Sequence, residues 1–486
     1  MNIRTRAAVV LGRGLGEASR RWGRGGGTVI GGRITTALDP RALARLSLGY
    51  RTILVSGTNG KTTTTRLLSS ALATSGATVV TNSGGANMPA GLVAALSAGR
   101  QRAGDGHGRP GQAGLAALEV DEGWLGTVMD ATRPAVVVLL NLSRDQMDRV
   151  SEVRMTASKW RQALARCPDV SVVANADDPM VVWAASTGTG AVGSDEGDAG
   201  GIGALGSDAA PTGTGAVGSD EGDAGGRRVL WVGAGQPWRA DSSGCPQCQG
   251  RLDFNPLGAD VGWSCRCGLR RPEPDVWIEN GRLVWPSHGG APDSTAPLGH
   301  PAGSDPGSWP IDLGLPGQFN RSNAAMALAG AGLIDPSINV ARALGAMAST
   351  RDIAGRYQVV EVGAGRARLL MAKNPAGWVE MFDLLSHASP ATVVLAINSR
   401  LADGRDPSWL WDVPFEALAG RPVVASGERC WDLAVRLSYA GVPHRVVADP
   451  RAALRQAASV SGATLDFVGN YTAFQDVRRS FGFASA

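Results

Sequence analysis

The stretch VSGTNGKTTTT, at residues 55–65, constrains the fold of this chain more than any other feature. It follows the apolar run RTILV and opens the run TTTTRLLSSALA, so the pattern predicts a strand, a tight loop and a helix. Backbone N–H groups at a helix N-terminus bind anions, and the usual phosphate-binding pattern is G-x-x-x-x-G-K-[ST]. Only Thr58 and Asn59 separate Gly57 from Gly60, which makes this loop two residues short.

The side chains of the loop indicate a nucleotide site; a glycine-containing turn before a helix is the alternative. Lys61 can place an ammonium group on the β- and γ-phosphates, and Thr62 can offer its hydroxyl to Mg²⁺. Lys61 is also one of only three lysines among 47 basic residues, which suggests a role that arginine cannot fill. We predict that ATP binds at Gly57, Thr58, Asn59, Gly60, Lys61, Thr62 and Thr63.

Apolar strands alternate with helices along most of the chain. Continuous apolar strands in such an alternation predict an α/β fold whose parallel sheet is covered on both faces. We predict an N-terminal segment (1–49), a central ATP-binding domain (50–334) and a Rossmann-like C-terminal domain (335–486). A cysteine cluster, a hairpin turning at Asn280-Gly281 and a Pro/Gly/Ser-rich stretch interrupt the alternation, so residues 185–310 are predicted to be an insertion.

The segment TGTGAVGSDEGDAGG occurs at 187–201 and again, unchanged, at 212–226. Its Gly, Asp, Ser and Ala residues cannot bury a core, so we predict a disordered loop. A functional acidic repeat is the alternative interpretation.

Polar clusters follow several of the predicted strands. They are Glu119 to Glu122, Asn141 to Asp148, and Asn175 to Asp178. The carboxyl ends of parallel strands face the ligand crevice of an α/β sheet. Glu119 or Asp121 could therefore complete a Mg²⁺ site with Thr62, and a solvated strand end is the alternative.

Four of the six cysteines lie within one short segment, as Cys245, Cys248, Cys265 and Cys267. Their spacing, C-x2-C-x16-C-x-C, is typical of a tetrahedral Zn²⁺ site. Four thiolates fill the coordination sphere of zinc, so we predict a structural site without a catalytic position. Cys167 and Cys430 are predicted to be buried apolar residues.

Composition excludes some classes of function. Mean hydropathy is −0.04, and no apolar run approaches the roughly 18 residues of a membrane span, so we expect a cytoplasmic protein. A net charge of +4 does not indicate nucleic-acid binding. A nucleic-acid-binding zinc ribbon remains an alternative. Against it, few basic residues flank the cysteines (Arg251, Arg266, Arg270 and Arg271) and no aromatic stacking array is present.

The short loop resembles that of the Mur ligases, the ATP-dependent amide-forming enzymes of peptidoglycan synthesis, and of their folylpolyglutamate synthase relatives. The segment GQFNRSNAA from Gly317 also resembles a family motif, and the resemblance implies that Asn320 contacts adenine and that Glu119 binds Mg²⁺. A closer resemblance is to the synthetase subunits of lipid II isoglutaminyl synthase. It rests on TNSGGANMPAG, LEVDE, NLSRDQMDR, KNPAGW, DGRDPSWLWDVPFE and the four-cysteine ribbon.

This resemblance implies a reaction. ATP would phosphorylate the α-carboxylate of D-glutamate in the lipid II stem peptide at the inner face of the membrane, and ammonia would then form the amide. Ammonia would come from a GatD-like class I glutamine amidotransferase. An acidic residue of this chain would complete that partner's Cys–His pair; we predict Asp403 first and Asp406 second, with an Asx-type turn as the alternative.

The rival enzyme is an amino-acid-adding Mur or folylpolyglutamate ligase. Those ligases carry D-H-L-D after the fourth strand, where this chain has Gln146 in place of the histidine. They also use a carbamylated lysine downstream, and Lys159 lies in roughly that region. The roles of Lys159 and Lys373 are left open by the sequence.

Overall fold

The computed structural model describes residues 3–21, 27–82, 86–102, 114–144, 152–186, 227–235, 238–254, 262–286, 307–350, 357–363, 365–387, 391–461 and 464–483. Two sequence predictions fall outside these ranges: the disordered duplicated loop at 187–201 and 212–226, and the cluster around Gln146. None of the helices within the described ranges has the length and apolarity of a membrane span.

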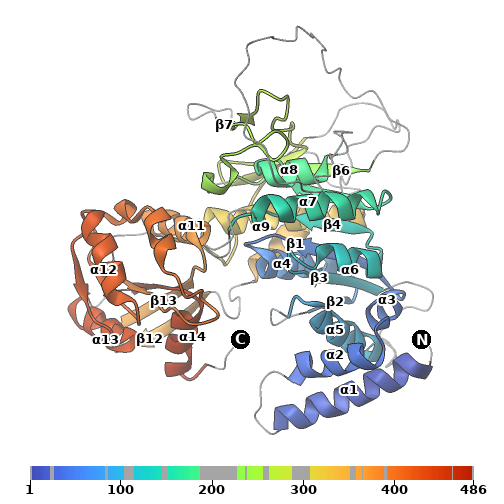
Figure 1. Ribbon diagram of the computed structural model, residues 1–486, viewed down its shortest axis with the longest axis horizontal. Helices are drawn as coiled ribbons and strands as arrows, with labels where there is room; N and C mark the ends of the chain where they lie inside the picture. The colour runs from blue at the N-terminus through green and yellow to red at the C-terminus, as the bar shows by residue number, and fades with distance from the viewer. Residues whose placement is uncertain are drawn as a thin grey trace, which may run out of the picture.

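In the described residues, the central domain is built on a nine-stranded sheet of order β11-β10-β9-β6-β5-β4-β1-β3-β2 (Figure 1). Neighbours from β2 to β9 are parallel, and β9, β10 and β11 run antiparallel. The strands are β1 (Tyr50–Ser56), β2 (Val79–Thr81), β3 (Gly114–Glu119), β4 (Val136–Leu139), β5 (Ser171–Asn175), β6 (Val229–Gly233), β9 (Val276–Glu279), β10 (Arg282–Trp285) and β11 (Gly307–Pro310).

Helices cover both faces of this sheet, as the continuous apolar strands predict. Ile53 and Val55 of β1 pack into one core with α4 (Lys61–Ala73), α9 (Gln318–Ile334) and α10 (Val340–Ala348). Leu54 points to the opposite core, formed with α5 (Pro89–Arg102), α6 (Leu125–Thr132), α7 (Glu152–Ala165) and α8 (Pro179–Ala185). The alternation of side chains along the strand explains this division.

The interval predicted as an insertion contributes to the central sheet. Strands β6, β9, β10 and β11 all lie within residues 185–310 and extend the sheet beyond β5. The predicted hairpin is confirmed, with Asn280 and Gly281 at φ 50° and 73° as a two-residue turn requires. In the part of this interval that the structure describes, the cysteine-bearing segment, with β7 (Asp253–Phe254) and β8 (Trp263–Ser264), forms a separate two-stranded sheet.

The N-terminal segment folds into α1 (Ile3–Arg21), α2 (Gly27–Leu38) and α3 (Ala42–Ser47). Helix α1 packs on α2, and α2 packs on α5 beside the edge of the sheet (Figure 1). Buried Asp39 ties the segment together, because its carboxylate accepts a hydrogen bond from Thr5 at 2.6 Å and pairs with Arg45 at 2.8 Å. Hydrogen bonds from Thr5 and Arg45 lower the pKa of Asp39 despite its burial.

The C-terminal domain has a six-stranded sheet of order β12-β13-β17-β14-β15-β16 in the described residues. Its elements are β12 (Tyr357–Val362), β13 (Gly365–Met371), α11 (Pro375–Ser386), β14 (Val393–Ala396), β15 (Val423–Ser426), α12 (Cys430–Tyr439), β16 (His444–Val446), α13 (Pro450–Ser461), β17 (Thr464–Gly469) and α14 (Tyr471–Ser480). All pairs except β12–β13 are parallel. The predicted α/β fold with a Rossmann-like C-terminal domain is confirmed.

Candidate functional site

The loop between β1 and α4 is held open by contacts with the end of β4. The backbone N–H of Thr58 donates to the carbonyl of Asn141, and the N–H of Asn59 donates to the Asn141 side chain, each at 2.9 Å. Since those two amides are engaged, an anion has to bind the amides that follow them, at the start of α4. The first-turn amides of a helix have no acceptor within the helix, so Gly60, Lys61, Thr62 and Thr63 form the candidate phosphate site.

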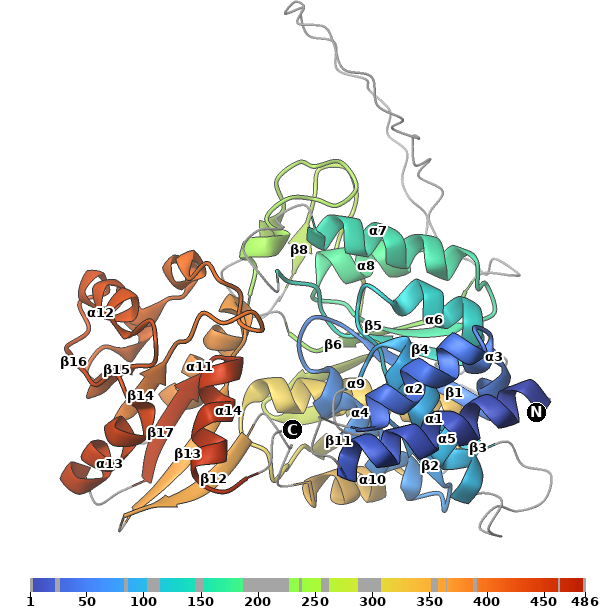
Figure 2. The ribbon, with the colours of Figure 1, turned by 60° about the horizontal axis from the view of Figure 1, so that its bottom comes forward.

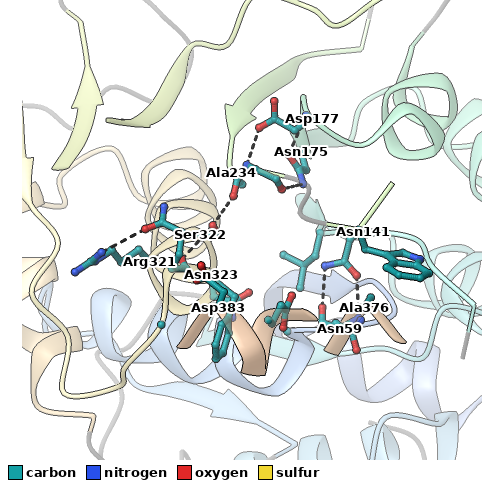
Figure 3. Close-up of a pocket in the computed structure, with 18 of the residues that line it drawn as sticks. Asn59, Asn141, Asn175, Asp177, Ala234, Arg321, Ser322, Asn323, Ala376 and Asp383 are labelled. Carbon is teal, nitrogen blue, oxygen red and sulfur yellow. Dashed lines mark hydrogen bonds between the residues drawn. The ribbon is translucent and has the colours of Figure 1, made fainter. Parts of the chain in front are cut away.

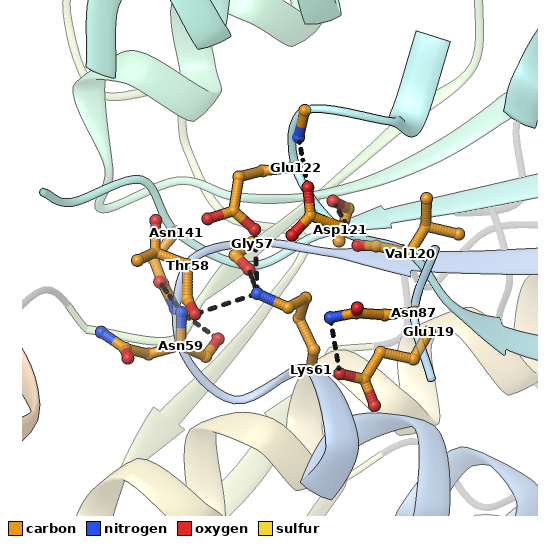
Figure 4. A network of polar contacts seen from close by, with 12 residues as sticks. Gly57, Thr58, Asn59, Lys61, Asn87, Glu119, Val120, Asp121, Glu122 and Asn141 are labelled. Carbon is orange, nitrogen blue, oxygen red and sulfur yellow. Dashed lines mark hydrogen bonds and ion pairs between the residues drawn. The ribbon is translucent and has the colours of Figure 1, made fainter. Parts of the chain in front are cut away.

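Lys61 is buried at the base of this loop. Its Nζ donates to the carbonyl oxygens of Gly57 and Thr58 and pairs with Glu122 at 2.9 Å (Figure 4). Glu122 belongs to the polar cluster after β3, but the sequence did not single it out as a partner of Lys61. A lysine that is 6% exposed yet keeps three oxygen partners is positioned to exchange one of them for a phosphate oxygen.

Glu119 ends β3 directly beside the loop, because β3 pairs with β1 in the register Val55 to Glu119. Its carboxylate is buried and contacts the side-chain amide of Asn87 at 3.5 Å (Figure 4). The buried carboxylate of Glu119 and the half-buried hydroxyl of Thr62, in the first turn of α4, are oxygen donors of the kind that Mg²⁺ prefers. The predicted magnesium ligands therefore fit that ion, whereas the carboxylate of Asp121 accepts a hydrogen bond from the Gly123 amide in a turn.

A cleft of about 1840 Å³ lies between the loop and the C-terminal domain. Asn59, Gly60 and Thr63 line it from the loop, and the N-terminal end of α9 and the first turns of α11 line it from the other sides (Figure 3). Asn59 also reaches across to Asn374, the N-cap of α11, at 3.3 Å. Typical small-molecule sites enclose roughly 300–1,000 Å³, so this cleft has room for a nucleotide and a second substrate.

Asn320, predicted to contact adenine, sits in the first turn of α9 and lines the cleft. Its Nδ2 donates to the carbonyl of Pro316 at 2.6 Å, while its Oδ1 is buried without a hydrogen-bond partner. A buried acceptor without a donor costs free energy, and an exocyclic amine of a bound base would satisfy it. Asn320 therefore fits the role that the resemblance implies.

Asp403 and Asp406 lie in the loop after β14, away from the residues that line the cleft. Asp403 is half-buried and accepts hydrogen bonds from the amide and the hydroxyl of Thr472, in the first turn of α14. Asp406 is exposed and accepts a hydrogen bond from the amide of Ser408 at 2.9 Å, which is an Asx-type turn. Both residues thus have structural contacts, and a catalytic role for either stays a prediction.

The four clustered cysteines converge. Their Sγ atoms all lie within 4.8 Å of one another, and two of the pairs, Cys245–Cys267 and Cys248–Cys265, are separated by 3.6 Å and 3.5 Å. Zinc–sulfur bonds of about 2.3 Å in a tetrahedron place sulfur atoms about 3.8 Å apart, so the cluster has the size of a zinc site. Without an ion, burial raises the pKa of Cys245 to about 12, whereas the Gly250 amide lowers the pKa of Cys248 to about 7.

The ribbon that carries these cysteines also lines the cleft, which the sequence did not predict. Arg271 of the ribbon pairs with buried Asp177, just after β5, at 2.6 Å, and Trp263 donates to the carbonyl of Ala176 at 3.2 Å. Arg270, Arg271 and Trp263 are among the lining residues. A zinc site in this position would fix one wall of the cleft.

The remaining two lysines differ in position. Lys373 lines the cleft at the start of α11, whereas Lys159 is exposed on α7 and is not among the lining residues. Cys167 and Cys430 are buried free thiols, as predicted.

We expect Gly60→Ala to weaken ATP binding by about tenfold or more. Gly60 has φ 84°, and a Cβ there would lie 2.4 Å from Oδ1 of Asn323, so the loop must shift. Isothermal titration with a non-hydrolysable ATP analogue measures the effect. Gly76→Ala is the matched control, because Gly76 has φ 80° but no atom within 4 Å of the added Cβ. Equal binding by both variants would contradict the assignment.

We expect the purified chain to carry about one zinc ion, and Cys265→Ser to lose it, because three thiolates and a hydroxyl hold zinc less tightly than four thiolates. Elemental analysis measures the metal. Loss of the ion should also expose the ribbon to trypsin at Arg251, Arg266 and Arg270. Cys430→Ser, at a buried cysteine on α12, is the control and should keep both the zinc and the protease resistance.

Comparison with known proteins gives the same picture of the chain. The Mur ligase middle domain family matches residues 55–197, and the MurT ligase C-terminal family matches residues 371–474. The lipid II isoglutaminyl synthase (glutamine-hydrolyzing) subunit MurT of Streptococcus pneumoniae is 27% identical over 91% of this chain and 88% of its own length. The subunit of the same name from Staphylococcus aureus is 27% identical over 99% of both chains.

Solved structures agree on the fold. MurF from Acinetobacter baumannii matches 92% of this chain and 80% of its own with a TM-score of 0.57 at 14% identity. The folylpolyglutamate synthase of Mycobacterium tuberculosis, complexed with ADP, matches 92% of this chain and 95% of its own length with a TM-score of 0.53 at 14% identity. With its middle domain, its C-terminal domain and its full-length relatives all of one kind, this chain belongs to the Mur ligase family and to the MurT branch within it.

Proposed function

We propose that this chain is the ATP-dependent synthetase subunit of a lipid II isoglutaminyl synthase. One observation carries the proposal: the short phosphate loop and a MurT-type C-terminal domain face each other across a single large cleft and touch through Asn59 and Asn374. Relatives that span the whole chain carry this activity in their names.

In the proposed reaction, a carboxylate oxygen of D-glutamate attacks the γ-phosphorus of ATP, and ADP leaves with the electron pair of the broken bond. The nitrogen of ammonia then attacks the acyl carbon, inorganic phosphate leaves, and the surplus proton passes to solvent. Lys61 and the amides of Gly60 to Thr63 stabilise charge on the transferring group. Thr62 and Glu119 would hold Mg²⁺, whose charge would neutralise the phosphates, and Asn320 would bind adenine.

We propose further that ammonia comes from a class I glutamine amidotransferase subunit of the GatD kind. The relatives are named as subunits of a glutamine-hydrolysing enzyme. Cys430 of this chain is buried on α12, and no histidine of the described residues hydrogen-bonds to it. A buried thiol of that kind does not make a glutaminase nucleophile.

The experiment is an amidation assay with lipid II, ATP and the chain, supplied with glutamine plus the partner or with ammonium alone. We expect product in both cases, and no product without ATP. The second candidate is an amino-acid-adding ligase, which the fold of MurF and folylpolyglutamate synthase favours. Incorporation of a labelled amino acid in place of ammonia would decide for it and against the proposal.

A further inference from the structure

Helix α1 has two apolar faces, and only one of them is covered. Thr5, Ala8, Val9, Gly12 and Gly16 form the buried face, which packs on α2. Ile3, Val10, Leu11 and Leu15 lie on the uncovered part of the helix, and their side chains are between 53% and 86% exposed. The helix is the outermost layer of its side of the molecule, and it comes to the front in Figure 2.

Arginines accompany this outward stripe. On a helical projection, Arg6 and Arg13 lie with Glu17 along one side of Ile3 and Val10, and Arg4 lies between Leu11 and Leu15, where it donates to the carbonyl of Leu38; all four charged residues are exposed. An exposed apolar stripe accompanied by arginines is the pattern of a helix that lies in the plane of a membrane surface, with leucines in the acyl region and arginines reaching the headgroups. At 19 residues the helix is about 28 Å long, so several lipids could contact it at once.

The charge of the chain is concentrated at this end. Residues 1–49 contain nine arginines against Glu17 and Asp39, a net +7, and because the whole chain carries +4, the other residues together carry −3. Such asymmetry attracts an anionic surface to the N-terminal helices and repels it from the rest of the protein. The complementary partner is therefore an anionic surface.

The N-terminal helices also connect rigidly to the candidate site. A Cβ on Gly32 of α2 would lie 1.8 Å from the carbonyl oxygen of Ala90, so the two backbones touch at the start of α5. Three residues earlier, the side-chain amide of Asn87 contacts the Glu119 carboxylate, and the carbonyl of Asn87 accepts a hydrogen bond from the backbone amide of Asp121. A surface that binds α1 would thus hold the cleft at a fixed distance from itself.

We propose that the outward face of α1 docks on an anionic lipid bilayer. The choice of a membrane over a second protein rests on the arginines of α1 and on the charge asymmetry. Its use rests on the proposed function, in which the substrate is linked to a lipid. Helix α1 lies on the surface and does not span it, in agreement with the absence of a spanning helix from the described residues.

The test is co-sedimentation of the full chain with vesicles of phosphatidylcholine mixed with phosphatidylglycerol, and with vesicles of phosphatidylcholine alone. We expect binding to the anionic vesicles that weakens as salt is raised. Leu11→Ser/Leu15→Ser should lower the partition coefficient about 100-fold, and Arg6→Gln/Arg13→Gln about 30-fold. Circular dichroism on each variant checks that the helices remain folded.

The matched control is Trp431→Ser/Val435→Ser, which removes two exposed apolar side chains at the same spacing from α12 and should bind vesicles like the unchanged protein. Absence of binding to anionic vesicles, or equal loss in the control, overturns the proposal. A dimer in sedimentation equilibrium that Leu11→Ser/Leu15→Ser dissociates would assign the face to a second copy instead. The assay contains neither ATP nor partner, so its outcome is independent of whether the chain amidates lipid II.

Discussion

Replacing Lys61 with alanine should lower ATP-dependent amidation about 1,000-fold or more, the scale expected when one preorganised donor to a developing negative charge is removed. Lys61 is the cation at the base of the phosphate loop, and its Nζ sits among the Gly57 and Thr58 carbonyls and the Glu122 carboxylate. Measurement of ADP release in the presence of lipid II and ammonium gives the effect.

Lys61→Arg is expected to lower the rate of amidation nearly as much as Lys61→Ala. The side chain is 6% exposed, and a planar guanidinium does not fit among three oxygens arranged around one ammonium nitrogen. This outcome would account for a lysine at this position in a chain that otherwise uses arginine almost throughout. An arginine variant with near-normal activity would refute that explanation.

The control for both variants is Arg66→Ala. Arg66 lies on the same helix α4 but is exposed, so its loss removes a cation without touching the loop. We expect the rate of Arg66→Ala to stay within about twofold of the unchanged protein, because solvent screens an exposed charge that does not contact the loop. If Arg66→Ala and Lys61→Ala reduced the rate alike, the effect of Lys61 would be general electrostatics and not a contact with phosphate.

The sequence predicted the elements of the fold well because most of them depend on local patterns. The loop at 55–65 and the hairpin turn at Asn280-Gly281 are each specified by a few neighbouring residues. The confirmed parallel sheet follows from continuous apolar strands in the same way.

What the sequence did not predict depends on contacts between distant residues. The ribbon's place on the wall of the cleft is set by Arg271 and Asp177, which are 94 residues apart in the chain. The pairing of Lys61 with Glu122 likewise joins two motifs that the sequence connected only through a predicted Mg²⁺ site and not through this ion pair. Strand β11 was missed because GSWP has no alternating apolar pattern and is recognisable only as the neighbour of β10.

The last prediction concerns the two aspartates offered to the partner. If Asp403 completes the partner's Cys–His pair, Asp403→Asn should lower glutamine-dependent amidation by about 1,000- to 10,000-fold, the scale seen when the orienting acid of a triad is lost. Amidation driven by ammonium should continue, because Asp403 is not among the residues that line the cleft proposed to bind ATP.

The structure supplies a rival explanation that has to be separated from this one. Asp403 holds the first turn of α14 through the amide and hydroxyl of Thr472, so its loss should also destabilise the C-terminal domain by about 1 kcal/mol. Thr472→Ala is the matched control, because it removes the hydroxyl partner and leaves the carboxylate in place. A structural role predicts that both variants lower the melting temperature and slow the glutamine and ammonium reactions alike.

Asp406→Asn completes the set. Asp406 is exposed, and among the described residues its carboxylate hydrogen-bonds only to the Ser408 amide, so its replacement should leave the melting temperature unchanged. Selective loss of the glutamine reaction in Asp406→Asn, with Asp403→Asn affecting both reactions equally, would transfer the role from Asp403 to Asp406. An acid that only orients the partner's histidine affects the reaction with glutamine and not the reaction with free ammonium. If neither variant slows the glutamine reaction more than the ammonium reaction, the acid that the partner uses is therefore a different residue.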